Sequence, residues 1–244
     1  MKPDLSSTLT IYGRNPVAEA LDNDAITVQR LHLAESNKPS SAIKDLRRQA
    51  ERRDIEIRYH SKQELSRISK NGRQDQGVAA DIFCPLLQPY ENLLSEPAQG
   101  RLLAVDRINN PQNLGMLIRS ACAGGIAGLL LPSEGGNTKL SPLVVKASAG
   151  TLFRFPVYRC HSLATALQSL GEHGYRRYCL AGGKGRTLHE ADSSQAAVYV
   201  LGNESEGVSR EVMNICDESL HIPMANQVES LNIAVTAALI AFAR

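Results

Sequence analysis

The sequence contains no tryptophan, and its five cysteines are scattered over 244 residues without a Cys-x-x-Cys pair. An odd number of widely spaced cysteines is not typical of a disulfide framework or of a zinc site. The six histidines also lack the spacing of metal ligands. We therefore predict no metal site.

Long apolar runs are missing as well. The first residues, MKPDLSSTLTIYG, lack the apolar segment of a signal peptide. No stretch approaches the roughly 18 uninterrupted apolar residues that a membrane span requires. We therefore expect a cytoplasmic protein that makes no membrane contact.

The remaining composition, 43% hydrophobic and 21% charged, is that of an ordinary globular protein. The net charge of +2 does not by itself indicate a nucleic-acid partner. Residues 44–73, however, hold ten Lys and Arg residues against five acids, a density that favours contact with phosphates. The alternative is a solvated helix face. The RNA-binding candidates are Arg47, Arg48, Arg52 and Arg53, with Arg73 and Gln76 on the loop SKNGRQDQG.

The N-terminal part has the pattern of a small α/β unit. Asn15-Pro16 predicts the cap and first residue of a short helix, ITVQRLHLA and IEIRY alternate as strands, and residues 41–53 and 62–68 are expected to be helical. The stretch PLLQPYENLLSEPAQG carries three prolines and little periodicity, which indicates a linker. We place the domain boundary near residue 95, which gives domains 1–95 and 96–244.

From residue 101 onward, short apolar strands alternate with helices. The expected strands include RLLAVD, AGLLLP, FRFPVY, AVYVLG and SLHIP, and the last expected helix is SLNIAVTAALIAFA. This alternation predicts an α/β domain with a mainly parallel sheet covered on both faces. Ligands of such sheets bind outside the carboxyl ends of the strands.

Three loops that join a strand to a helix carry polar residues at those ends. In RINNPQNLGMLIRS, Asn113 is predicted to cap the following helix, with Arg119 about one and a half turns further on, so that both approach one ligand. In LGNESEGVS, two glycines bracket an acidic loop that contains Glu204. In IPMANQVESLN, Ser230 and Asn232 lie at the start of the last helix, and capping of that helix is their alternative role.

Together the segments NNPQNLGMLIRSA, LGNESEG and IPMANQVESLN closely resemble the three signature motifs of the SpoU family of RNA methyltransferases, in the SPOUT superfamily. Their order, each at a strand end within residues 106–244, makes the resemblance specific. It implies methyl transfer from S-adenosylmethionine to a ribose 2′-hydroxyl, a homodimer, and a parallel-sheet domain whose C-terminal segment forms a trefoil knot. Ala225 and Ala234 depart from the glycine and serine that are common in the third motif.

The resemblance also implies the site residues. The catalytic candidates are Asn113, Arg119, Glu204, Ser230 and Asn232, and the cofactor-binding candidates are Leu201, Gly202, Ile222, Pro223, Met224 and Leu231. For Arg119 we expect first an anchoring role on the phosphate of the target nucleotide, because a guanidinium is a poor base. The alternatives are that Arg119 forms a surface salt bridge and that the LG and IP pairs merely end strands.

The N-terminal segments IYGRNPVAEAL and NGRQDQGVAA are similar to the L30-like substrate-binding domain found in the ribosomal-RNA branch of this family. This favours ribosomal RNA over transfer RNA as the substrate. A non-catalytic RNA-binding or ribosome-assembly protein on the same fold is the main alternative, although all five catalytic candidates are present. A nucleotide-dependent oxidoreductase lacks support because no GxGxxG follows a first strand. A base methyltransferase of the same superfamily is a nearer rival.

Overall fold

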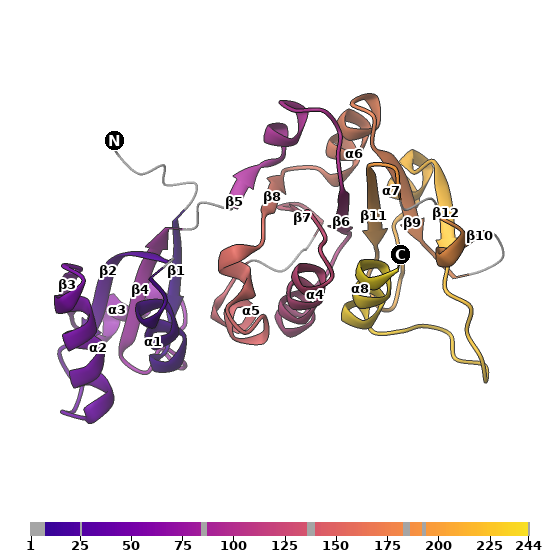
Figure 1. The fold of residues 1–244 in the computed structure, drawn as a ribbon. Helices are drawn as coiled ribbons and strands as arrows, with labels where there is room; N and C mark the ends of the chain where they lie inside the picture. The colour runs from indigo at the N-terminus through magenta and orange to yellow at the C-terminus, as the bar shows by residue number, and fades with distance from the viewer. Residues whose placement is uncertain are drawn as a thin grey trace. The chain divides into compact units, whose positions relative to one another are not determined.

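The computed structural model describes residues 8–24, 26–83, 87–135, 140–182, 186–191 and 194–243. The chain divides into two compact units, residues 1–85 with 140–146 and residues 86–139 with 147–244 (Figure 1). The first division falls at the start of the proline-rich stretch. The rest of that stretch forms β5 (Leu87–Pro89) and the 3₁₀ helix η2 (Tyr90–Leu94) of the larger unit.

The smaller unit contains a four-stranded sheet in the order β1-β4-β2-β3. Strands β1 and β2 run antiparallel to β4, and β3 runs parallel to β2. The strands are β1 (Thr8–Tyr12), β2 (Thr27–Ala34), β3 (Glu56–His60) and β4 (Val78–Phe83), and the helices are α1 (Arg14–Asp22), α2 (Ser41–Arg52) and α3 (Lys62–Ser69).

Two helices of this unit show how local sequence sets their ends. Helix α2 begins after Ser40, whose hydroxyl accepts a hydrogen bond from the backbone N–H of Ile43, as expected for an N-cap. The prediction that Asn15 caps α1 is wrong. Gly13 is the N-cap, with a φ of 94° that favours glycine, and Pro16 lies in the first turn, where backbone N–H groups have no partner within the helix.

The larger unit contains an eight-stranded sheet in the order β10-β12-β9-β11-β6-β7-β8-β5, in which every neighbouring pair is parallel. The predicted parallel sheet is therefore confirmed. Besides β5, its strands are β6 (Arg101–Val105), β7 (Gly128–Pro132), β8 (Val157–Cys160), β9 (Arg176–Leu180), β10 (Arg186–Thr187), β11 (Ala197–Leu201) and β12 (Glu218–His221).

One predicted strand, FRFPVY, begins later than expected. Residues 151–154 form the 3₁₀ helix η3 (Thr151–Arg154), and β8 starts only at Val157. Pro156 immediately precedes the strand and has no N–H to donate to a neighbouring strand. The apolar pattern alone did not distinguish these two conformations.

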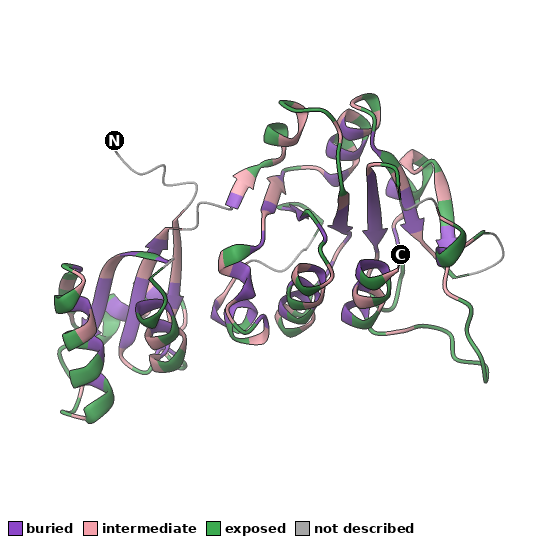
Figure 2. Cartoon of the chain, viewed as in Figure 1, coloured by how far each residue is buried: buried purple, intermediate pink, exposed green. Residues whose placement is uncertain are grey.

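Successive side chains of the central strands point to opposite faces of the large sheet. Leu102, Ala104, Val198 and Val200 pack in one core with α6 (Leu163–Glu172) and α7 (Arg210–Ile215). On the opposite face α4 (Pro111–Ala123) and α8 (Ile233–Phe242) pack against each other (Figure 1). The remaining helices are α5 (Pro142–Ala147), most of which belongs to the smaller unit, and the 3₁₀ helix η4 (Leu188–Glu190). The central strands are accordingly buried (Figure 2).

Within the described ranges, no helix is long and apolar enough to cross a membrane. Among the same residues, no group of three His, Cys, Asp or Glu side chains is placed to hold a metal ion. The described cysteines Cys122, Cys160, Cys179 and Cys216 are free, and Cys84 lies outside the described residues.

Candidate active site at the carboxyl ends of the parallel strands

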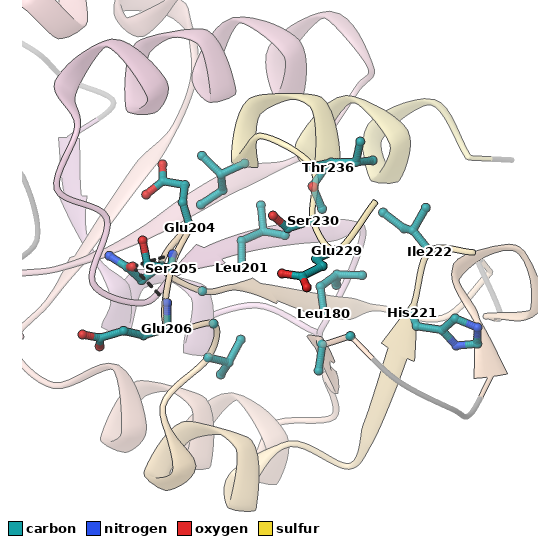
Figure 3. A pocket seen from close by; sticks show the side chains of 18 of the residues that line it. Leu180, Leu201, Glu204, Ser205, Glu206, His221, Ile222, Glu229, Ser230 and Thr236 are labelled. Atoms are coloured by element: carbon teal, nitrogen blue, oxygen red, sulfur yellow. Dashed lines mark hydrogen bonds between the residues drawn. The ribbon is translucent and has the colours of Figure 1, made fainter. Parts of the chain in front are cut away.

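A cleft of about 690 Å³ opens at the carboxyl ends of three neighbouring strands. Leu180 ends β9, Leu201 ends β11, and His221 ends β12, and all three line the cleft. Figure 3 shows the loop with Glu204, Ser205 and Glu206 at one end of the cleft and His221 and Ile222 at the other. The cleft thus lies where the topology of a parallel sheet predicts a ligand site.

The loop after β11 is a tight hairpin. Asn203 and Gly207 exchange backbone hydrogen bonds of 3.1 and 2.9 Å, and the Asn203 side chain accepts from the N–H groups of Ser205 and Glu206. A Cβ atom on Gly202 would lie 2.1 Å from the carbonyl carbon of Gly207. Only glycine permits this approach of two backbone segments beside the cleft.

Arg107 anchors this hairpin from the end of β6. Its guanidinium donates to the Glu206 carboxylate at 2.5 Å and to the Gly207 carbonyl at 3.1 Å, while its own carbonyl accepts from the Asn203 side chain at 3.0 Å. The neighbouring carboxylate of Asp106 accepts from the backbone N–H of Ser209 at 2.6 Å. Arg107 is not among the site residues predicted from the sequence, although it lies in the first of the three polar loops.

Side chains from all three polar loops meet beside the cleft. Asn113 donates to Glu204 at 2.6 Å, and Asn232 donates to Asn113 at 3.1 Å. The carbonyl oxygen of the Asn232 side chain also accepts from the backbone N–H of Ala234 at 2.9 Å, so Asn232 caps α8 as well. The capping role and the contact with Asn113 therefore coexist in one residue.

The prediction that Asn113 caps α4 is wrong. Asn110 is the N-cap, its side chain accepts from the N–H of Gln112 at 2.9 Å, and Pro111 occupies the first helical position. Proline there costs no hydrogen bond and its φ is already helical. Asn113 consequently lies in the first turn of α4, where its side chain is available to Glu204.

Arg119 and Ser230 occupy different surroundings. Ser230 lines the cleft. Arg119 is exposed and does not belong to the residues that line it. Six residues after Asn113, Arg119 points about a third of a turn away from it around α4. Within this one chain, therefore, Arg119 and Asn113 do not face the same side of the helix.

Most of the predicted cofactor residues line the cleft, namely Leu201, Gly202, Ile222, Met224 and Leu231. Pro223 lies between two of them in the sequence but is not a lining residue. Residues that sequence reasoning missed include Leu180, Met213, Glu229 and Thr236. Ligands of a parallel sheet bind outside the carboxyl ends of its strands, which include the end of β9, but no sequence motif marks that end.

The predicted RNA-binding arginines differ in their contacts. Arg47 and Arg48 pair with Glu51 and Asp45 on α2, at 3.7 and 3.0 Å, and Arg52 is exposed. Figure 2 shows exposed residues along the outer side of α2. Arg53 instead donates to the carbonyl oxygens of Leu21 at 2.7 Å and Ile26 at 2.6 Å, so it ties the end of α1 to α2.

The two predicted RNA contacts on the loop after α3 are both exposed. Arg73 borders a groove on the smaller unit. The side-chain oxygen of Gln76 accepts from the backbone N–H of Arg14 at 3.2 Å, and Gln76 has a φ of 53°. The contact fixes Gln76 at the start of α1, whereas Arg73 remains directed to the surface.

Two family models match the chain. The SpoU rRNA Methylase family matches residues 100–242, and the model for RNA 2′-O ribose methyltransferase substrate binding matches residues 10–85. The first match lies mostly in the larger unit, and the second lies within the smaller unit.

Among relatives, the chain is 34% identical over 236 residues to the 23S rRNA (guanosine-2′-O-)-methyltransferase RlmB of Xanthomonas campestris, covering 95% of this chain and 94% of that protein. Among solved structures, the AdoMet-bound rRNA methyltransferase from Sinorhizobium meliloti has a TM-score of 0.70 at 22% identity, covering 97% of this chain and 86% of that one. AviRb from Streptomyces viridochromogenes, in complex with AdoMet, has a TM-score of 0.69 at 23% identity, with 97% and 89% covered. At these identities the structural likeness shows a shared fold.

Proposed function

Because the chain belongs to the SpoU rRNA methylase family, we propose that it transfers a methyl group from S-adenosylmethionine to a ribose 2′-hydroxyl of ribosomal RNA. The observation that carries the proposal is the convergence of Asn113, Glu204 and Asn232, from three separate loops, beside one cleft at the strand ends. Because a relative is named as a 23S rRNA methyltransferase, we favour the RNA of the large ribosomal subunit as the substrate of this chain.

The cleft suits S-adenosylmethionine in size, lining and charge. Its volume of about 690 Å³ lies within the usual range for small-molecule sites. Leu201, Ile222 and Leu231 offer apolar walls for an adenine ring, and Gly202 lines the cleft beside them. The carboxylates of Glu204 and Glu229 complement the cofactor's positive charges. The Glu206 carboxylate already pairs with Arg107. When bound, S-adenosylmethionine supplies an electrophilic methyl group on a positively charged sulfur.

The residues of the chain align the acceptor and assist loss of its proton. Methyl transfer is an in-line displacement, so small errors in the position of the hydroxyl are costly. Glu204 holds the Asn113 amide, and Asn232 fixes its other end, which leaves this group in one orientation beside the cleft. Ser230 contributes a hydroxyl at the lining of the cleft. We assign to Arg119 the anchoring of the substrate phosphate.

A homodimer would cover an exposed apolar stripe on α8. Val235, Leu239 and Phe242 are 47%, 40% and 60% exposed and follow one another at helical spacing, and Met116 of the adjacent α4 is 41% exposed. Residues 233–242 contain no charged side chain. Such a helix is expected to be buried on all sides. The occupant we propose is the same surface of a second copy.

The position of Arg119 adds a reason for this dimer. Arg119 lies three residues after Met116 on the exposed side of α4, next to the proposed contact surface. It is absent from the residues that line the cleft of its own chain. We propose that Arg119 serves the cleft of the second copy, which would make dimerisation necessary for activity.

The two family matches suggest a separate role for each domain. We propose that residues 1–95 bind RNA and provide the linker, and that residues 96–244 bind the cofactor and catalyse transfer, with a C-terminal trefoil knot. Support for the knot comes from the family resemblance and from β11, which lies between β6 and β9 although it follows both in sequence. Within a cell, we place the enzyme in the cytoplasm, where ribosomal RNA is assembled.

Incubation of the protein with radiolabelled S-adenosylmethionine and unmodified ribosomal or transfer RNA tests the function. We expect label in large-subunit ribosomal RNA. Label in transfer RNA alone would overturn the substrate class. No transfer to either RNA, together with no cofactor binding, would favour a non-catalytic RNA-binding protein.

A further inference from the structure

The smaller unit carries a groove between α3 and the loop that follows it. The groove has a volume of about 670 Å³. Three of its lining residues are positively charged, and the others are uncharged. They are Lys62, Gln63, Ser66, Arg67, Gly72 and Arg73.

The two carboxylates nearest in sequence are engaged by the fold. Glu64 accepts from the backbone N–H and the hydroxyl of Ser61, at 2.9 and 2.8 Å, and closes the capping box of α3. These hydrogen bonds are the main reason why the pKa of Glu64 is lowered. The positive charge of Arg67 makes the smallest contribution to this shift. Asp75 is buried and accepts from the Ser69 hydroxyl at 2.9 Å and from the Gly77 N–H at 3.0 Å. Neither carboxylate lines the groove, so the charged side chains of the lining are all positive.

The walls of the groove are fixed before any ligand arrives. A Cβ atom on Gly72 would lie 2.3 Å from the Ser66 hydroxyl oxygen, so the loop lies directly against α3. The Asn71 side chain donates to the Tyr12 hydroxyl at 2.8 Å, which ties the loop to β1. A preformed site loses little conformational entropy on binding.

Three of the four arginines at residues 47–53 already have partners, and the fourth, Arg52, is exposed. Arg47 and Arg48 already pair with acids of the same helix, and Arg53 binds backbone carbonyls. Within the described part of the chain, no salt bridge within 4.0 Å joins Lys62, Arg67 or Arg73 to a carboxylate. Binding of an anion in the groove therefore breaks no existing ion pair.

We infer that this groove is the main binding site for the phosphate backbone of the RNA substrate, an inference that rests on the proposed function. Lysine and arginine without an aromatic platform favour phosphate contacts over stacking with bases. The groove would consequently bind RNA without reading its sequence. Arg47, Arg48 and Arg52 would make a smaller contribution.

The test compares two full-length variants that lose the same charge. One is Lys62→Gln/Arg67→Gln/Arg73→Gln in the groove, and its matched control is Arg47→Gln/Arg48→Gln/Arg52→Gln on α2. The Kd for in vitro transcribed large-subunit ribosomal RNA is measured between about 50 and 200 mM KCl, the range in which phosphate contacts are revealed. S-adenosylmethionine binding and thermal unfolding monitor folding, and Arg73→Glu is a second groove variant.

We expect the groove variant to lose RNA affinity at least about tenfold. The slope of its log affinity against log salt concentration should become less steep by about 2, and both changes should be less than half as large in the α2 variant. Cofactor binding should stay at the wild-type value in both. The inference about the groove would be overturned if both groove variants bound RNA with wild-type affinity, or if the α2 variant lost more RNA affinity than the groove variant. In either case the wild type would still transfer methyl groups. Failure of the wild type to methylate any RNA would instead overturn the proposed function.

Discussion

The Asn113 side chain donates a hydrogen bond of 2.6 Å to the carboxylate of Glu204, 91 residues away in the sequence. This bond joins the start of α4 to the hairpin after β11, and Asn232 extends it to the start of α8. The three motifs of the sequence thus become one connected site, whose geometry depends on each member.

Glu204→Gln tests this connection. The substitution keeps the shape but removes the charge, and it weakens the hydrogen bond to Asn113. We expect kcat to fall about 10²-fold because the acceptor is aligned less accurately, with a change in KM for S-adenosylmethionine of less than about threefold. Ser205→Ala on the same hairpin is the control, since that side chain takes no part in the contact. Equal kcat values for Glu204→Gln and wild type would contradict the role.

Mixing of two inactive variants tests the dimer and the role of Arg119. Arg119→Ala and Glu204→Gln should each be nearly inactive as homodimers. If Arg119 serves the partner's cleft, each mixed dimer has one intact site, so an equimolar mixture should recover about a quarter of wild-type activity. Methyl transfer after mixing and re-equilibration gives the answer. No recovery in dimers shown to exchange subunits would place Arg119 in the cleft of its own chain.

Arg53 should matter for stability rather than for RNA affinity. Its guanidinium donates to the carbonyls of Leu21 and Ile26, which lose these partners in Arg53→Ala. We expect a loss of about 1–3 kcal/mol in the free energy of unfolding, measured by urea denaturation. Arg52→Ala, at the exposed neighbouring position, serves as the control and should change it by less than about 0.5 kcal/mol. A free energy of unfolding equal to that of wild type in Arg53→Ala would contradict the structural role of Arg53.

His60 should make the smaller unit less stable in mild acid. Burial lowers the pKa of His60, and the nearby His32, whose Nδ1 lies 2.9 Å from its Nε2, lowers it further. The unfolded chain then binds a proton more tightly than the folded one, so stability falls as pH drops through about 6.5 and levels off below the folded pKa.

Urea denaturation at pH 7 and pH 5, followed by circular dichroism, measures this dependence. His60→Gln should have a smaller loss of stability between the two pH values than wild type. His189→Gln, an exposed histidine of the larger unit, should behave like wild type in this comparison. An unchanged pH dependence in His60→Gln would exclude His60 as its source.

The sequence sufficed for the features that local pattern determines. Apolar alternation predicted the parallel sheet, and the second and third motifs lie in loops that line the cleft. The prediction failed for the cap of α4 because Asn110 and Asn113 both suit an N-cap, and only Pro111 in the first helical position distinguishes them.

Tertiary contacts account for most of what the sequence did not predict. Arg53 belongs to a basic run that is typical of a nucleic-acid surface, yet its partners lie 27 and 32 residues earlier in the chain. Arg107 reaches an acid 99 residues later. No periodicity records such pairings, because each depends on how separate elements pack.

The proposed function requires that the modified atom is the ribose 2′-oxygen. The most direct measurement is mass spectrometry of nucleosides from large-subunit ribosomal RNA methylated by the purified protein. The account predicts a nucleoside whose added methyl group remains on the sugar fragment and whose phosphodiester resists alkaline hydrolysis. A methyl group on the base fragment would contradict it, and the protein would then be a base methyltransferase that uses the same cleft.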